Sequence, residues 1–306
     1  MNMKDQYNRN INYMRISITD RCNLCCTYCK GYEQLKHKDI LRYEEILDIC
    51  KVAVSLGIHF FKITGGEPCA RKGYLSFIER LKELEGVYGV TLTTNGTLFN
   101  KEDIDALKKM KLDGMNISID TLDREHYKRI TGKDCISKVI ENVVYAKKIG
   151  LYVKINSVLL DELENKEIME LIEFGNQYSI PVRFIELMPM KDEKSSHRNK
   201  EYVLSLLEDV EEDICKYGNG PAIYYRCNKG IVGFIEPVHG KFCNQCNRIR
   251  LTSAGYLKAC LFHTTGRNIR NCENLEQVMK DIIVHKPKGH NFENEVVGIS
   301  MSQIGG

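Results

Sequence analysis

The chain has 306 residues, of which 43% are hydrophobic, and it carries a net charge of +3 at neutral pH. This length suffices for one large α/β domain, alone or with a smaller one; the small net charge gives no support to nucleic acid as a partner, and no stretch is apolar enough for a membrane span. The polar first ten residues contain no apolar signal core, and an odd count of 13 cysteines fits a reducing, cytoplasmic location and metal binding better than a disulfide framework.

Strand-like and helical patterns alternate from the N-terminus to about residue 187. Strands are expected at residues 12–19, 58–64, 88–94, 115–120, 151–159 and 182–187, and helices at about 43–56, 74–85, 101–111, 136–149 and 165–178. This alternation is typical of a parallel sheet with right-handed crossovers. A closed barrel contains eight such units, so the pattern predicts an α/β fold built on an incomplete (β/α)6 TIM-like barrel.

The predicted strands alternate polar and apolar residues. Arg15, Ser17 and Thr19 share one face of the first strand, and Lys62 and Lys154 occupy the polar faces of two others. Because the apolar faces must meet the helices, the polar faces should line a wet or ligand-filled interior. The alternative is an antiparallel sheet with one solvated face, which the intervening helices disfavour.

A polar linker at residues 190–200 follows the last predicted strand. We therefore divide the chain into a partial barrel, residues 1–189, and a C-terminal α+β extension, residues 190–306. The extension should contain a helix at about 200–214 and short strands near 222–226 and 231–236. By composition, the last twenty residues are expected to be mobile.

A cysteine motif follows the first predicted strand directly. Cys22, Cys26 and Cys29 form C-x3-C-x2-C, with Tyr28 before the last cysteine. Thiolates at this spacing can turn toward one iron–sulfur cube, and three ligands leave the fourth iron open to a substrate. The spacing alone also permits the trio that uses Cys25 in place of Cys26. A zinc knot, which normally has four ligands, is a further alternative.

A second cysteine cluster lies near the C-terminus. Cys243, Cys246 and Cys260 are spaced C-x2-C-x13-C, which indicates a metal site. Zinc would require a fourth ligand, and His263 or Cys272 could supply it.

Two arginines, Arg248 and Arg250, lie beside this cluster. On an extended segment, residues two apart point the same way, so both guanidinium groups can address one polyanion. The alternative is a pair of exposed surface charges.

The two motifs resemble known enzymes. The first resembles the signature of the radical S-adenosylmethionine (SAM) superfamily. The second, Phe242-Cys-x-x-Cys-Asn-Arg-Ile-Arg-Leu251, together with the terminal Gly305-Gly306, makes essentially the whole chain resemble the GTP 3′,8-cyclase family, whose members open molybdenum cofactor biosynthesis. The resemblance implies a lyase that converts GTP to (8S)-3′,8-cyclo-7,8-dihydroguanosine 5′-triphosphate, with two 4Fe-4S clusters and SAM as cofactors.

The resemblance also implies residue roles. The N-terminal cluster would be held by Cys22, Cys26 and Cys29, and the C-terminal cluster, in the extension, by Cys243, Cys246 and Cys260. SAM would contact Tyr28, Gly65, Gly66, Glu67, Ser118 and Met188. GTP would contact Arg15, Lys62, Thr94, Lys154, Arg183, Arg248 and Arg250. The catalytic positions would be Arg15, Lys154 and the tail residues Gly305 and Gly306, which are expected to reach the active site.

The implied partners are GTP as substrate, a flavodoxin- or ferredoxin-like reductant, and cyclic pyranopterin monophosphate synthase as the downstream enzyme, with no nucleic acid or membrane and with a monomer or homodimer as the assembly. The chain departs from the usual family pattern at Lys30-Gly31, which replace Met-Pro, at Lys62, which replaces a common arginine, and at Cys25. Two alternatives are a radical SAM peptide-modifying enzyme with an auxiliary cluster and a non-enzymatic zinc or iron–sulfur protein.

Overall fold

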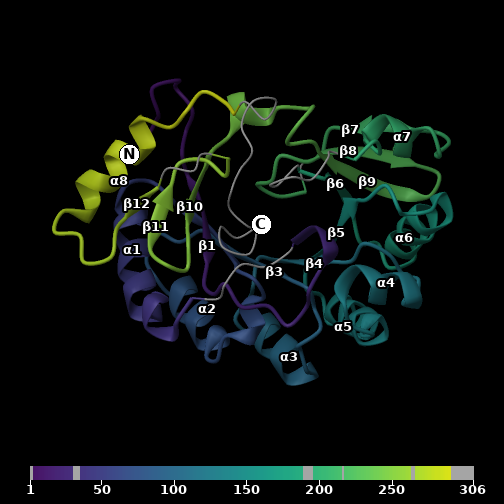
Figure 1. Ribbon diagram of the computed structural model, residues 1–306, viewed down its shortest axis with the longest axis horizontal. Coiled ribbons are helices and arrows are strands. Elements are labelled where there is room, and N and C mark those ends of the chain that lie inside the picture. Colours follow the sequence, from purple (N-terminus) through teal and green to yellow (C-terminus); the bar gives the residue numbers. More distant parts are fainter. Residues whose placement is uncertain (1–2, 30–34, 189–195, 216, 263–265, 291–306) are drawn as a thin grey trace.

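One large curved sheet organises the molecule. The computed structural model describes residues 3–29, 35–188, 196–215, 217–262 and 266–290. Within these residues, 12 strands form a single sheet in the order β12-β11-β10-β1-β2-β3-β4-β5-β6-β9-β8-β7. Figure 1 shows this sheet as an arc with helices α1 to α6 along its outer side. The protein is therefore an α/β protein with one face of its sheet covered by helices.

The centre of the sheet consists of six neighbouring parallel strands, as the alternation of patterns predicts. They are β1 (Tyr13–Ser17), β2 (Phe60–Thr64), β3 (Gly89–Thr94), β4 (Gly114–Ser118), β5 (Val153–Leu159) and β6 (Val182–Glu186). The connecting helices are α1 (Tyr43–Ser55), α2 (Tyr74–Lys82), α3 (Lys101–Lys109), α4 (Arg124–Thr131), α5 (Ile136–Lys148) and α6 (Asn165–Gln177). Helix α4 was not predicted, because its eight residues are mostly polar and its start depends on the Asp123 side chain, which accepts a hydrogen bond from the His126 N–H.

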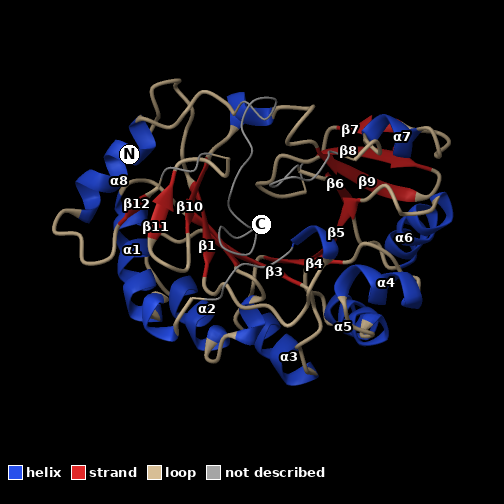
Figure 2. Cartoon of the chain, in the orientation of Figure 1, coloured by secondary structure: helices blue, strands red, loops and turns tan. Residues whose placement is uncertain are grey.

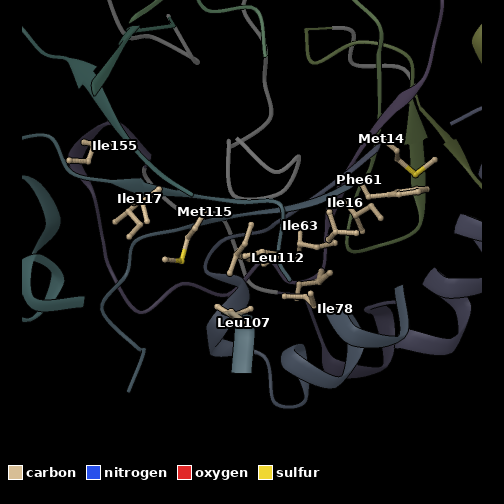
Figure 3. Close-up of a cluster of buried hydrophobic side chains, with 14 of the residues drawn as sticks. Met14, Ile16, Phe61, Ile63, Ile78, Leu107, Leu112, Met115, Ile117 and Ile155 are labelled. Atoms are coloured by element: carbon tan, nitrogen blue, oxygen red, sulfur yellow. The ribbon is translucent and has the colours of Figure 1, made fainter. Parts of the chain in front are cut away.

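The apolar residues of these strands form the core against the helices. Figure 3 shows Ile16 and Ile63 of the strands and Ile78 and Leu107 of α2 and α3 between the sheet and the helix layer. All four side chains are fully buried. The alternating pattern of the strands therefore assigns one face to the core and leaves the other face for the interior of the arc.

The later part of the chain extends both edges of the sheet (Figure 2). At one edge, β9 (Gly230–Ile235) pairs parallel with β6 and is followed by β8 (Ile223–Cys227) and β7 (Glu211–Asp213). At the other edge, β10 (Arg248–Leu251) pairs parallel with β1 and is followed by β11 (Tyr256–Lys258) and β12 (Arg267–Asn268). Helix α8 (Leu275–Val284), which was not predicted, packs on α1.

The helix expected at 200–214 is wrong beyond its first turn. The structure has the short helix α7 (Lys200–Leu204) and then strand β7. Asp209 adopts a left-handed backbone with φ of 54°, which a continuous helix cannot contain. Asp213 of β7 then forms a 3.0 Å ion pair with Arg226 on β8, which is the register partner of Glu211. Pairing with a distant strand therefore overrides the local helical pattern.

The described part of the chain contains no helix long and apolar enough to cross a membrane. The tail from residue 291 and the linker residues 189–195 lie outside the described residues, as do Lys30-Gly31.

Candidate functional site

A cavity of about 280 Å³ lies on the face of the sheet that the helices do not cover. The strand residues that line it are those that alternate with the buried core residues. Of the expected site residues, those that line the cavity are Arg15, Cys22, Cys26, Tyr28, Cys29, Lys62, Gly65, Gly66, Thr94, Ser118, Arg183, Met188, Arg248 and Arg250. The expected residues Glu67, Lys154, Cys243, Cys246 and Cys260 lie outside this lining, and Gly305 and Gly306 lie outside the described residues.

Three cations form a row across one side of the cavity. Arg250 on β10 is the register partner of Arg15 on β1, and Arg15 is the register partner of Lys62 on β2. Burial lowers the pKa of Arg15 to about 10, and burial together with repulsion from Arg15 lowers the pKa of Lys62 and of Arg250 well below their usual values. Buried like charges are costly, so this row is suited to a ligand with several negative charges.

Two further cations lie on β5 and β6. Arg183 lines the cavity and donates a 2.5 Å hydrogen bond to Oδ1 of Asn116. Lys154 donates its Nζ proton to the carbonyl of Tyr217, and burial together with Arg183 lowers the pKa of Lys154 to about 7. The loop that begins at Tyr217 therefore holds the amine of Lys154, and Lys154 does not line the cavity.

That loop reaches the cavity, which sequence reasoning missed. Asn219, Gly220 and Pro221 line the cavity beside Arg183. The run Gly218-Asn-Gly-Pro221 carries a strong turn signal, which could have indicated a loop with a special backbone but not its contact with the site.

The first cysteine motif turns three thiols into the cavity. Cys22, Cys26 and Cys29 line it, whereas Cys25 is exposed outside the lining and donates its backbone N–H to the carbonyl of Thr131 at 2.9 Å. Burial raises the pKa of Cys22 and of Cys26. Buried thiols require a cationic partner to become thiolates.

These three thiols fit an iron–sulfur cube with one open iron. Within the described ranges, no group of His, Cys, Asp or Glu side chains is arranged to hold a single metal ion. Three thiols that line one cavity could instead hold a larger iron–sulfur cluster, which would supply an iron without a protein ligand for a bound molecule. The arrangement favours Cys26 over Cys25 as the middle ligand.

A buried carboxylate supports the cysteine loop. The hydroxyl of Tyr28 donates to Oδ2 of Asp120 at 2.7 Å, and the N–H of Val158 donates to Oδ1 at 2.8 Å. Burial raises the pKa of Asp120 to about 6. Sequence reasoning placed Asp120 on the polar face of its strand but assigned it no role; its two partners are more than 35 residues away.

The Gly65-Gly66-Glu67 turn contacts the cysteine loop more closely than expected. The N–H groups of Gly66 and Glu67 donate to the carbonyls of Thr19 and Arg21, both at 2.7 Å. A Cβ added to Gly66 would lie 2.5 Å from the carbonyl oxygen of Arg21. The glycines are therefore required by the neighbouring backbone, whereas their sequence pattern was attributed to a ligand.

Glu67 holds the next strand end in place. Its carboxylate is buried and accepts hydrogen bonds from the Thr94 hydroxyl and the Asn95 N–H, both at 2.7 Å. It thereby fixes Thr94, which lines the cavity.

The second cysteine motif borders the same cavity through its neighbouring residues. Phe242 and Leu261, which adjoin Cys243 and Cys260, line the cavity together with Arg248 and Arg250. The strand β10 directs both arginines the same way, as their spacing predicts.

Two cations, Arg248 and Lys286, lie near the thiol of Cys246. Burial raises the pKa of Cys246, but Arg248 and Lys286 outweigh it and lower the value to about 7. Burial and the neighbouring thiols Cys260 and Cys246 raise the pKa of Cys243. Cys243 thus interacts with both of the other thiols, and three thiols in this neighbourhood are suited to a second cluster. For the zinc alternative, His263 lies outside the described residues.

Comparisons with known proteins find relatives along nearly the whole chain. Residues 16–175 match the family model of the radical SAM superfamily, and residues 180–292 match that of Molybdenum Cofactor Synthesis C. The chain is 39% identical over 327 aligned positions to a GTP 3′,8-cyclase of Alkaliphilus oremlandii, covering 99% of this chain and 100% of that protein. It is 39% identical over 326 positions to a GTP 3′,8-cyclase of Petrotoga mobilis, with the same coverage.

Solved structures show the same fold at low identity. SuiB of Streptococcus suis bound to S-adenosylmethionine is 17% identical, with a TM-score of 0.67 over 90% of this chain and 68% of that chain. Methylornithine synthase is 16% identical, with a TM-score of 0.50 over 60% of this chain and 55% of that chain.

Proposed function

Because the chain belongs to the GTP 3′,8-cyclase family of the radical SAM superfamily, we propose that it converts GTP to (8S)-3′,8-cyclo-7,8-dihydroguanosine 5′-triphosphate. This reaction is the first step of molybdenum cofactor biosynthesis, and the enzyme is a lyase that uses two 4Fe-4S clusters and SAM. The observation that carries the proposal is the row Arg250–Arg15–Lys62, which faces the same cavity as the thiols of the first cysteine motif. A triphosphate can therefore bind within reach of a SAM-binding cluster.

The cysteines divide into two ligand sets. Cys22, Cys26 and Cys29 hold the first cluster, and Cys243, Cys246 and Cys260 hold the second. When bound, the first cluster and SAM supply the radical chemistry that begins with hydrogen abstraction at ribose C3′. The protein supplies binding, orientation and exclusion of water.

The cations bind the substrate. Arg250, Arg15 and Lys62 neutralise the phosphates, and Arg183 addresses GTP from β6. Charge-assisted hydrogen bonds of this kind are the strong ones, and Arg248 extends the row along β10. Lys62 presents one ammonium where an arginine would present a fork, so it acts as a point charge.

The remaining assignments follow from the resemblance to the family. Tyr28, Gly65, Gly66, Ser118 and Met188 contact SAM, and Thr94 contacts GTP. Glu67 acts on this site through Thr94 and Asn95. Lys154 and Arg15 are catalytic positions, and the amine of Lys154 reaches GTP when the Tyr217 carbonyl releases it. The tail residues Gly305 and Gly306 complete the active site.

The architecture supports a partial barrel. Residues 1–189, with strands β1 to β6, form an incomplete (β/α)6 TIM-like barrel, and residues 190–306 form an α+β extension that carries the second cluster. The enzyme acts in the cytoplasm as a monomer or homodimer, receives electrons from a flavodoxin- or ferredoxin-like protein and delivers its product to cyclic pyranopterin monophosphate synthase.

The test is an anaerobic incubation of the reconstituted protein with SAM, a reductant and GTP. We expect 5′-deoxyadenosine and a cyclised nucleotide to form together. Arg250→Ala should lower turnover or affinity for GTP by about ten- to a hundredfold, whereas the exposed Arg226→Ala should not. Formation of 5′-deoxyadenosine without a nucleotide product would favour the peptide-modifying alternative.

Metal analysis tests the remaining alternative. Two four-iron clusters require about eight iron atoms per chain. One or two zinc atoms in place of iron would indicate the non-enzymatic binding protein.

A further inference from the structure

The segment that follows α8 runs along the second cysteine motif. Lys286 is 1% exposed, and its Nζ donates a 2.8 Å hydrogen bond to the carbonyl of Arg248 and a second one to the carbonyl of Ala259. Arg248 lies two residues after Cys246, and Ala259 directly precedes Cys260. One buried ammonium therefore joins the two chain segments that carry these cysteines.

The same segment packs on Cys243, the third cysteine of this motif. A Cβ added to Gly289 would lie 3.7 Å from Cβ of Cys243 and 3.8 Å from its Sγ, so the backbone packs directly on this side chain. The backbone N–H of His290 donates to the Cys243 sulfur, and it opposes the rise in pKa that burial causes. N–H···S hydrogen bonds and nearby positive charge both stabilise sulfur ligands of iron clusters.

Arg9, at the other end of the sequence, holds this segment from outside. Its guanidinium forms a buried 2.5 Å ion pair with Asp5. It also donates to the carbonyls of Cys243 at 2.7 Å, Pro287 at 2.6 Å and Lys288 at 3.0 Å. The planar fork of an arginine suits such a set of carbonyl acceptors.

We propose that Lys286, held in place through Arg9, is a positioning residue of the second cluster. The ammonium group of Lys286 interacts with the thiols of Cys246 and Cys260. Its hydrogen bonds fix the backbone segments that carry these two cysteines. Because Lys286 binds the carbonyl of Arg248, it also fixes the strand end that carries this cavity arginine. The proposal rests on the proposed function only in placing a cluster at these cysteines.

The charge of Lys286 should also affect the redox properties of the cluster. Three thiolates make the loaded site anionic, and a buried cation offsets this charge. Removing the cation disfavours the more negative, reduced state, so the reduction potential of the second cluster should fall.

The test compares Lys286→Met with Lys288→Met in the reconstituted holoenzyme. Lys288 lies in the same segment, is exposed and offers only its backbone carbonyl to Arg9, so it is a matched control. We expect Lys286→Met to lower the midpoint potential of the second cluster, measured by redox titration with electron paramagnetic resonance detection, and to lose up to half of the iron to a chelator. Uncoupled SAM cleavage should remain, while KM for GTP rises. Lys288→Met should match the wild type.

A second pair of variants separates positioning from general folding. Arg9→Lys retains a charge for Asp5 but loses the fork, so it should loosen the second cluster partially, and Arg9→Gln should do so more strongly. Wild-type iron content and potential in Lys286→Met would overturn the proposal, as would loss of both clusters together or zinc at the second site. Iron content and potential are measured without GTP, so a chain that failed to cyclise GTP would still test this inference.

Discussion

The hydroxyl of Tyr28 and the carboxylate of Asp120 are joined by a 2.7 Å hydrogen bond across 92 positions of sequence. Tyr28 directly precedes Cys29, and Asp120 follows β4 and is bound in turn by the N–H of Val158 on β5. This carboxylate therefore ties the first cysteine loop to two strands of the sheet.

The first prediction tests this tie. Tyr28→Phe should lower the free energy of unfolding by about 1–3 kcal/mol, because it removes a hydrogen bond to a charged acceptor. In an Asp120→Asn background, the same change should cost less, and the difference measures the coupling between the two side chains. Chemical denaturation of the four proteins supplies these values. Strictly additive losses would show that the pair is not coupled.

The second prediction concerns the cluster ligands. Cys26→Ser should abolish SAM cleavage and remove the iron of the first cluster, whereas Cys25→Ser should keep both, because only Cys26 lines the cavity. Iron content and 5′-deoxyadenosine formation are measured on both variants. The opposite result would assign the middle ligand to Cys25.

The third prediction is that GTP binding is coupled to the uptake of protons. Burial lowers the pKa of Lys154 to about 7, so its amine is largely neutral in the free protein at pH 8, and burial together with Arg15 lowers the pKa of Lys62 in the same direction. Bound phosphates favour the charged forms, and GTP binding at pH 8 should therefore take up protons. Titration calorimetry in two buffers of different ionisation enthalpy measures the uptake.

Lys154→Arg is the control for this uptake. Arginine stays charged at pH 8, so this variant should take up fewer protons than the wild type. Equal heats in both buffers for the wild type would contradict the prediction. In the free protein, the depressed pKa of Lys154 also makes its contribution to the free energy of unfolding rise with pH above about 7.

The fourth prediction concerns the glycine turn. Gly66→Ala places a methyl group 2.5 Å from the Arg21 carbonyl, so it should lower the free energy of unfolding by about 1–3 kcal/mol and weaken iron binding by the cysteine loop. Gly114→Ala is the control, because its nearest neighbours would lie at 3.5 Å, an ordinary contact distance. Thermal unfolding and iron content compare the two. Equal behaviour of both variants would show that the turn can shift away from the loop.

The fifth prediction concerns the tail, which lies outside the described residues. Deleting Gly305 and Gly306 should leave iron content and GTP binding nearly intact but uncouple SAM cleavage from product formation. Glycine ends can thread beside a ligand because they lack side chains. The ratio of cyclised nucleotide to 5′-deoxyadenosine is the measurement. A wild-type ratio would indicate an ordinary chain end.

The sequence by itself determined the elements whose signals are local. Polar–apolar alternation located the strands β1 to β6 and directed Arg15 and Lys62 to the interior, because side chains on a strand alternate between its two faces. Spacing also sufficed to bring Cys22 and Cys29 to one loop and to place Arg248 and Arg250 on one face of a strand.

Only the tertiary structure decided which distant segments meet. Strand β10 pairs with β1 across more than 230 residues, and this pairing sets Arg250 beside Arg15. The contacts of Arg9 with Cys243 and of Lys286 with Arg248 have the same origin, as does the replacement of the expected helix at 205–214 by β7. Such pairings depend on the packing of the whole sheet. The periodicity of a short stretch of sequence therefore does not determine which distant residue pairs with a strand end or binds a buried cation.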